Sequence, residues 1–194
     1  MKLCVFQGTF NPIHNAHLRV ANSLSGDFDK ILFIPAFEPP HKIIDSSMSI
    51  HRLNMVKLAI QNYEKFEVSD IEYKRGGKSY TYLTICEFYE LYNVENKINF
   101  IIGTDAFKNI EKWYRADELK KLVKFLVFQR EDKFNISEYD ILRQKGYDFE
   151  FQSLPFEDIS STELRYKIKN GEDLENFLPT KVGDYIRKNE LYKT

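Results

Sequence analysis

Short apolar runs alternate with longer amphipathic stretches along this chain. Residues 3–6 form an apolar run that stops at Gly8 and Pro12, and residues 15–24 then space their apolar side chains at helical intervals. This pattern predicts a strand, a loop and a helix in that order. The same reasoning predicts further strands at residues 30–37, 66–73, 98–102, 122–128 and 147–154. It predicts further helices at residues 48–60, 80–92, 161–170 and 179–189.

Strands that alternate with helices of this length are typical of parallel βαβ units with right-handed crossovers. We therefore expect an α/β fold with a Rossmann-like doubly wound parallel sheet and a small C-terminal helical portion from about residue 159. A chain of 194 residues with 43% hydrophobic content can bury one substantial core, which predicts a single domain over residues 1–194. Ligands of such a fold bind at the C-terminal ends of the strands.

The charge balance indicates a small ligand rather than a nucleic acid. The chain has 28 Lys and Arg residues against 29 Asp and Glu residues, so nothing favours DNA or RNA as a partner. The N-terminal apolar segment is too short for a signal peptide, and no apolar run approaches the roughly 18 residues of a membrane span. Since Cys4 and Cys86 are its two cysteines, we expect reduced thiols, a cytoplasmic protein and no membrane partner. The sequence leaves the oligomeric state open, a homo-oligomer included.

The loop after the first predicted strand carries candidate chemistry. Gly8 lets backbone amides approach a phosphate, and the start of the next helix offers unpaired N–H groups to an anion. His14 and His17 are three residues apart, so both imidazoles can stabilise charge on a reacting phosphate. Each feature alone is more often a turn, a helix cap or a surface histidine. A metal site is disfavoured, because a zincin pair lies four residues apart with a Glu between.

The run GTFNPIHNAH, from Gly8 to His17, resembles the phosphate loop of the HxGH nucleotidyltransferase superfamily, in particular that of bacterial nicotinate-nucleotide adenylyltransferases. The usual run there is similar to GGTFDPxHxGH, and this chain departs from it at Gln7, Asn11 and Ala16. Ala16 adds only a methyl group, whereas Gln7 removes a flexible position and is expected to change how ATP sits. The resemblance implies ATP contacts from Gly8, Thr9, Phe10, His14 and His17, with both histidines catalytic.

A second segment lies near the C-terminus, where hydroxyl side chains precede a periodic apolar run. On its own, this pattern is explained by a helix N-cap and a solvated arginine. The segment ISSTELR, from Ile159 to Arg165, is however similar to the superfamily signature ISSTxIR and departs from it only at Leu164. The resemblance implies that Ser160, Ser161, Thr162 and Arg165 hold the β- and γ-phosphates of ATP, with Arg165 catalytic. A planar guanidinium suits this role because it donates two hydrogen bonds and keeps its charge.

Residues between the two signatures are implied to select the acceptor. Lys42 follows Pro39-Pro40 and is a candidate for ATP phosphate binding, although Pro-Pro is as readily a rigid surface turn. By the resemblance, Asp105 contacts the nucleotide sugar and Trp113 stacks on a pyridine ring, where the charge of the ring adds a cation–π attraction. Backbone N–H groups near Thr81 and Tyr114 would read a carboxylate. The implied acceptor-binding residues are Thr81, Gly103, Asp105, Trp113 and Tyr114.

The expected reaction is transfer of AMP from ATP to nicotinate mononucleotide, giving nicotinate adenine dinucleotide and pyrophosphate in NAD biosynthesis. We expect Mg²⁺ to be carried in with ATP and no metal site made by the protein alone. Three alternatives stay open: a related transferase that uses nicotinamide mononucleotide or phosphopantetheine, a catalytically silent nucleotide-binding module, and a metal-dependent hydrolase built on the four histidines. The expectation requires that the stretch beginning at Gly8 and the stretch ending at Arg165 face each other across one cleft.

Overall fold

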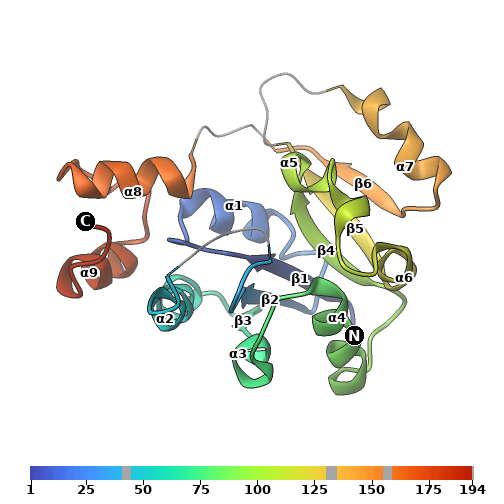
Figure 1. Ribbon diagram of the computed structural model, residues 1–194, viewed down its shortest axis with the longest axis horizontal. Coiled ribbons are helices and arrows are strands. Elements are labelled where there is room, and N and C mark those ends of the chain that lie inside the picture. Colours follow the sequence, from blue (N-terminus) through green and yellow to red (C-terminus); the bar gives the residue numbers. More distant parts are fainter. Residues whose placement is uncertain (41–44, 130–134, 155–158, 194) are drawn as a thin grey trace.

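The centre of the molecule is a parallel sheet whose strand order reverses in the middle. The computed structural model describes residues 1–193 apart from 41–44, 130–134 and 155–158. These residues form a six-stranded sheet in the order β3-β2-β1-β4-β5-β6, with every neighbouring pair parallel (Figure 1). The strands are β1 (Leu3–Gly8), β2 (Lys30–Pro35), β3 (Phe66–Val68), β4 (Ile98–Gly103), β5 (Val123–Phe128) and β6 (Phe149–Gln152). The predicted doubly wound fold is confirmed, and its switch point lies between β1 and β4.

Helices cover both faces of this sheet. Figure 1 shows α1 and α4 on opposite sides of it, with α8 and α9 together at one end of the molecule and α7 at the other. The helices are α1 (Asn15–Ser23), α2 (Met48–Ile60), α3 (Ile71–Arg75), α4 (Thr81–Leu91), α5 (Thr104–Phe107), α6 (Ala116–Leu122), α7 (Asp140–Gln144), α8 (Ser161–Lys169) and α9 (Thr180–Lys188), with 3₁₀ turns η1 (Ile110–Lys112) and η2 (Ile136–Tyr139). None of the described helices is long and apolar enough to cross a bilayer.

The two faces of the sheet have separate apolar clusters, because side chains alternate along a strand. Leu3 and Val5 of β1 pack in a cluster with α3, α4, α6 and α7, whereas Cys4 between them packs with α1, α2, α8 and α9. Burial raises the pKa of the Cys4 thiol, so this cysteine stays protonated and unreactive.

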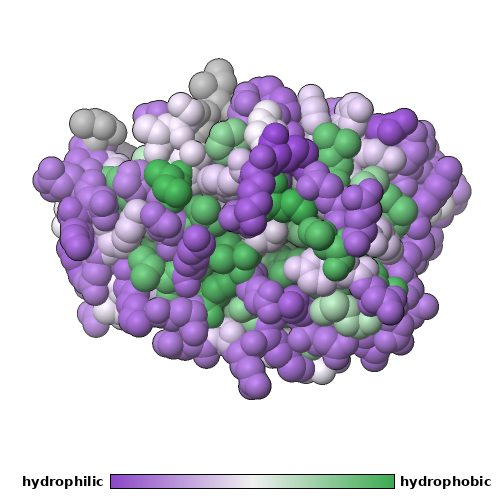
Figure 2. Space-filling model, turned by 90° about the horizontal axis from the view of Figure 1, so that it is seen from below, coloured by the Kyte–Doolittle hydropathy of each residue, from purple (hydrophilic) through white to green (hydrophobic). Residues whose placement is uncertain are grey.

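In the part of the chain that the structure describes, two charged side chains are buried. Figure 2 shows a face on which hydrophilic residues surround apolar ones gathered in the middle. Among the described residues, Arg52 and Glu72 are the charged side chains that are buried, each about 1% exposed. Because a buried charge needs partners, these two residues are expected to organise the elements around them.

The structure differs from the predicted pattern in three places. The predicted strand 66–73 ends at Val68, and Ile71–Arg75 forms α3 because the Asp70 carbonyl accepts hydrogen bonds from the N–H groups of Tyr73 and Lys74. The strand predicted at 30–37 ends at Pro35, since the carbonyls of the next two residues turn toward Arg52. The short helices α5, α6 and α7 were not predicted. Each has at most two turns, which is too short for a helical spacing of apolar residues to be recognised in the sequence.

Candidate active site

The loop between β1 and α1 is shaped by the contact between Gly8 and Phe10. Phe10 is 2% exposed and has a φ of 48°, so its ring turns back over β1. A Cβ atom on Gly8 would lie 2.9 Å from Cζ of Phe10. Gly8 is therefore required by this close approach, in addition to any role that its backbone amide has toward an anion.

His14 and His17 form a stacked pair at the start of α1. Their ring centroids are 3.7 Å apart and the rings are inclined by 33°. The backbone N–H of His14 donates to Nδ1 of His17 at 3.2 Å. Because Nδ1 is an acceptor in this contact, the neutral imidazole of His17 carries its proton on Nε2. His17 is thereby held as an Nε2–H donor, and the edge of the Phe10 ring supports it at 5.1 Å.

The C-terminal signature contacts this loop directly. Ser161 Oγ donates to the carbonyl oxygen of Pro12 at 2.9 Å, and Arg165 Nη1 donates to that of Asn11 at 2.8 Å. Arg165 Nη2 also donates to Oγ1 of Thr162 at 3.1 Å. The helix-cap interpretation holds for Ser160, whose hydroxyl accepts from the N–H of Glu163 at 3.1 Å. The other residues of the signature do more than end a helix, since they join segments about 150 residues apart.

A cleft of about 690 Å³ lies where the two signatures meet. Gly8 does not line it directly, but the next residue, Thr9, does, and Arg165 lines it as well. The requirement that both signatures border one cleft is therefore met. The lining residues are Thr9, Phe10, Asn11, His14, His17, Asp45, Met48, Asp105, Ser160, Ser161, Thr162, Arg165 and Tyr192.

Two further cavities adjoin this cleft at the C-terminal ends of β1 and β4. The Asp105 cavity measures about 370 Å³ and is bordered by His17, Gly103 and Asp105. The Trp113 cavity measures about 460 Å³ and is bordered by Thr81, Trp113 and Tyr114. Thr9 lines all three spaces, so they meet at the end of β1. This is the switch point of the sheet, where α/β proteins of this topology bind ligands.

Aromatic side chains make up one wall of the Trp113 cavity. Trp113 makes a T-shaped contact with Phe100, with ring centroids 6.0 Å apart, and its side of the cavity is open to a ligand. Tyr114 stacks on Tyr80 at 4.5 Å and is 46% exposed. The helix α4 begins at Thr81, which also borders the cavity, and the first N–H groups of a helix have no acceptor within the helix. The cavity can thus hold a planar ring that has an anionic or polar substituent.

The other two histidines and Lys42 complete the account of predicted residues. Lys42 and His41 lie outside the described residues. His51 does not border the cleft, since its Nδ1 is 2.9 Å from the hydroxyl of Tyr185 on α9. The described residues contain no group of three His, Cys, Asp or Glu side chains that could hold a metal ion.

Arg52 is a residue of this region that the sequence pattern did not reveal. Its guanidinium donates to the carbonyl of Thr9 at 2.9 Å and to the carbonyls of Ala36 and Phe37 after β2. Burial lowers its pKa, but an arginine stays charged at neutral pH. Arg52 therefore ties the loop after β1 to the loop after β2. One sequence signal could have identified Arg52 as buried: it lies one turn before Val56, among the buried residues of α2.

Tyr192 was likewise missed. Its hydroxyl donates to Oδ1 of Asn11 at 2.7 Å, which brings the C-terminal end of the chain against the loop. Burial raises the pKa of this hydroxyl, while the nearby Arg165 lowers it in part. The tyrosine therefore stays a neutral donor. Its position near the end of the chain carried no periodic signal that would have singled it out.

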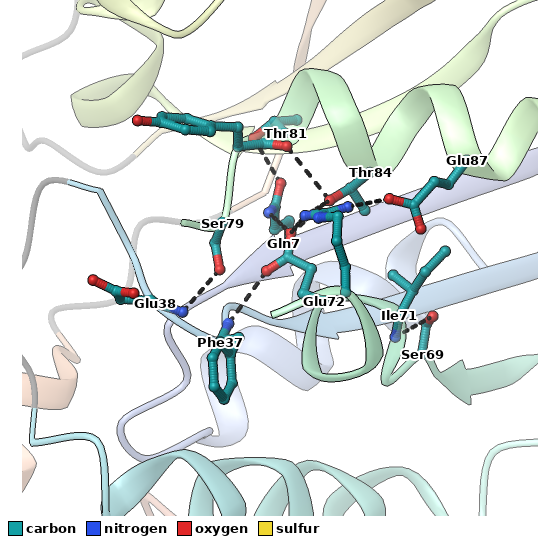
Figure 3. Close-up of polar contacts among 12 residues, drawn as sticks. Gln7, Phe37, Glu38, Ser69, Ile71, Glu72, Ser79, Thr81, Thr84 and Glu87 are labelled. Atoms are coloured by element: carbon teal, nitrogen blue, oxygen red, sulfur yellow. Dashed lines mark hydrogen bonds and ion pairs between the residues drawn. The ribbon is translucent and has the colours of Figure 1, made fainter. Parts of the chain in front are cut away.

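Gln7 makes its side-chain contacts beside the Trp113 cavity. Its amide lies between Thr81 and Glu72, on the wall of the Trp113 cavity, rather than on the wall of the cleft (Figure 3). The residue borders the Asp105 cavity as well.

Comparisons with known proteins agree with this arrangement. Residues 5–167 match the family model described as cytidylyltransferase-like, so the fold and site define a member of that class. A "Probable nicotinate-nucleotide adenylyltransferase" of Clostridium tetani is 41% identical and is covered over 99% of both chains. A protein of the same name from Fusobacterium nucleatum is 39% identical, with coverage of 97% of this chain and 98% of the relative. The chain therefore belongs, within the cytidylyltransferase-like family, to the nicotinate-nucleotide adenylyltransferases, which are nucleotidyltransferases.

A solved structure gives the same fold. The Plasmodium falciparum nicotinic acid mononucleotide adenylyltransferase complexed with NaAD superposes with a TM-score of 0.81, at 24% identity, over 98% of this chain and 97% of that one. At this level of identity the match supports the architecture alone. The predicted family and fold are confirmed by these comparisons.

Proposed function

We propose that this protein transfers the AMP part of ATP to the 5′-phosphate of nicotinate mononucleotide, giving nicotinate adenine dinucleotide and pyrophosphate, a step of NAD biosynthesis. The names of the curated relatives support this reaction. So do the three adjoining cavities, which offer separate spaces for a triphosphate, a nucleoside and a flat acceptor ring.

One observation carries the proposal. The hydrogen bonds from Ser161 and Arg165 to the loop after β1 bring a hydroxyl, a guanidinium and two imidazoles to the walls of one cleft. Guanidinium and imidazole N–H groups donate to phosphate oxygens, and so can the hydroxyls of Ser160 and Thr162, which accept hydrogen bonds here and keep their own protons. A cleft of about 690 Å³ with such walls fits a triphosphate.

The reaction needs positioning rather than a nucleophilic side chain. An oxygen of the acceptor's 5′-phosphate attacks the α-phosphorus of ATP, a new P–O bond forms, and the bond to the bridging oxygen breaks as pyrophosphate leaves with its electron pair. In this scheme His17 donates from Nε2 to a non-bridging oxygen of the α-phosphate, as its fixed tautomer allows. His14 holds that orientation through its backbone N–H and supports the ring of His17 through stacking.

Arg165 is placed to hold the leaving group. Its contacts with Asn11 and Thr162 engage two of the five N–H donors of a guanidinium, and the remaining donors can reach the β- and γ-phosphates. Ser161 and the first N–H groups of α8 lie beside it. Because these donors all lie near the start of α8, they can stabilise the negative charge that develops on the pyrophosphate as it leaves.

The residues of the cleft are compatible with Mg²⁺ that enters with ATP. Asp45 and Asp105 offer carboxylates at its walls, and the described residues there lack a third ligand for an all-protein site. We propose that Asp45 and Asp105 would hold an ion that arrives with the triphosphate. When bound, the ion neutralises phosphate charge.

The acceptor ring is proposed to occupy the Trp113 cavity. The indole of Trp113 supplies a stacking surface for a pyridinium ring. The N–H groups at the start of α4, with that of Tyr114, supply donors for the carboxylate of the ring. Asp105, which borders both the cleft and its own cavity, is placed to accept hydrogen bonds from ribose hydroxyls.

Pyrophosphate release tests the proposal. Purified protein, ATP and Mg²⁺ are combined with nicotinate mononucleotide, nicotinamide mononucleotide or phosphopantetheine, and the initial rate is measured for each. The expected result is the highest kcat/KM with nicotinate mononucleotide and loss of the rate on chelation of Mg²⁺. Fastest turnover of phosphopantetheine would reassign the acceptor, and no release with any acceptor would indicate a silent nucleotide-binding module.

A further inference from the structure

Gln7 stands where the relatives' pattern has glycine, and its side chain joins a buried hydrogen-bond network behind the Trp113 cavity. Gln7 Nε2 donates to Oε1 of Glu72 at 2.6 Å, and Oε1 of Gln7 accepts from Oγ1 of Thr81 at 2.7 Å (Figure 3). Glu72 lies on α3 and Thr81 begins α4. The network therefore links the end of β1 to α3 and to the start of α4, where Thr81 borders the cavity.

Glu72 determines the direction of every hydrogen bond in this network. Its carboxylate accepts from Gln7, from Oγ1 of Thr84 at 2.7 Å and from the N–H of Phe37 at 3.2 Å. Arg75 lies 3.7 Å away as its ion-pair partner. An ionised carboxylate can only accept, so the amide nitrogen of Gln7 must face Glu72 and its oxygen must face Thr81.

This direction removes the only hydroxyl proton of Thr81 from the cavity. Since Oε1 of Gln7 can only accept, the Thr81 hydroxyl must donate its proton to it. Toward a ligand in the Trp113 cavity, which Thr81 borders, the hydroxyl then offers lone pairs alone. With glycine at position 7, this hydroxyl would be free to turn and donate its proton to a ligand.

A hydroxyl that can only accept distinguishes two kinds of ring substituent. A carboxylate has no proton to give to Thr81 and must be bound by N–H groups. A carboxamide has an NH₂ group that can donate to Thr81 while its carbonyl accepts from the same N–H groups. The second N–H of the Gln7 amide does not separate the two, because a carboxylate and a carbonyl accept from it alike.

We propose that Gln7, acting through the Thr81 hydroxyl, adapts the Trp113 cavity to a carboxamide ring, so that the enzyme discriminates less against nicotinamide mononucleotide than a variant with glycine at this position does. The inference rests on the proposed function. Gln7 is a positioning residue in it, and Thr81 is the group that contacts the ring.

The test is the discrimination ratio, which is kcat/KM for nicotinate mononucleotide divided by kcat/KM for nicotinamide mononucleotide. Gln7→Gly should raise this ratio about fivefold, the effect of one hydrogen bond gained by the acid, whose carboxylate then accepts from the freed Thr81 hydroxyl while the amide can still donate to it. Thr81→Val, which removes the hydroxyl and keeps the backbone N–H, should raise the ratio by a similar factor. Thr81→Ser, which keeps the hydroxyl, should leave the ratio within about twofold of the unsubstituted enzyme.

Thr84→Val is the matched control. Thr84 donates to the same carboxylate of Glu72 from the same helix, but it does not border the Trp113 cavity. It should lower the melting temperature without changing the ratio. If Thr84→Val shifted the ratio as much as Gln7→Gly does, the effect would be general loosening of the network, and the proposal would be wrong.

Two other outcomes also decide the matter. An unchanged ratio in Gln7→Gly, with normal turnover of nicotinate mononucleotide, would overturn the role of Gln7 and leave the proposed function standing. No turnover of either mononucleotide by the unsubstituted enzyme would overturn both. Binding of each mononucleotide without ATP, measured by calorimetry, should show the same change in ratio as turnover does.

Discussion

Arg165 Nη1 donates a 2.8 Å hydrogen bond to the backbone carbonyl of Asn11, across 154 residues of sequence. This contact joins α8 to the loop after β1 and borders the cleft on the side of the proposed leaving group. The guanidinium therefore has two tasks, holding the loop and binding phosphate, which a smaller cation cannot combine.

Arg165→Lys should reduce kcat by about 100-fold, because an ammonium group is a point charge and cannot contact Asn11 and a phosphate in one plane. The melting temperature should change by only a few degrees, since the residue is at the surface of the cleft. Arg187→Lys on α9 is the control and should keep full turnover. Equal turnover in the two variants would contradict the role of Arg165.

His17→Ala should reduce kcat by roughly 100- to 1000-fold, the usual effect of removing one donor to a developing charge. Far-UV circular dichroism and melting should be little altered. The control is His51→Ala, which removes the contact with Tyr185 away from the cleft. That variant should lose stability and keep its turnover, so a loss of turnover in both would indicate a structural cause.

Gly8→Ala tests the contact with Phe10. The added methyl group would lie 2.9 Å from the ring, so Phe10 must move and the free energy of unfolding should fall by about 1–3 kcal/mol. Because Phe10 supports His17, kcat should fall too. Gly26→Ala, which meets nothing within 4 Å, is the matched control. Denaturant unfolding of both variants is the measurement, and equal unfolding midpoints would contradict the prediction.

Arg52→Met should lower the free energy of unfolding by about 3 kcal/mol or more. It leaves the buried carbonyls of Ala36 and Phe37 without their donor, and an unpaired buried acceptor costs about 1–3 kcal/mol. Lys57→Met, an exposed position of the same helix, should change stability by less than about 0.5 kcal/mol. Urea titrations of the two variants test the difference, and similar midpoints would show that Arg52 is dispensable.

Tyr73 should make stability fall at high pH. Burial raises its pKa from 10.0 to about 12, and its hydroxyl donates to the carbonyl of Ser49 at 2.7 Å. The folded state therefore keeps the proton longer than the unfolded state, so this contribution is complete below pH 10 and is lost as the pH rises toward 12. The advantage of the unsubstituted protein over Tyr73→Phe should shrink between pH 9 and pH 11.5, measured by urea unfolding; a constant difference would contradict this.

Most strands and the longer helices were predictable because their periodicity is local. The helix predicted at 48–60 matches α2 at both ends, and residues 98–102 became β4 with one added residue. The strand predicted at residues 66–73 was wrong beyond Val68. The alternation of apolar residues there did not reveal that Glu72 would be buried among donors from β1, α4 and the loop after β2. A charged residue is expected to be exposed as long as the residues that pair with it in the folded protein are unknown.

The sequence by itself determined the alternation of strands and helices, the family, and the two signatures around His17 and Arg165. These follow from residue types and spacing, which are properties of the chain alone. Only the tertiary structure decided that α8 closes onto the loop after β1, that Arg52 holds three carbonyls together, and that Gln7 turns toward Thr81. Hydrogen bonds of this kind depend on which distant elements meet and on which groups at the meeting point can only accept, and neither is encoded in local periodicity.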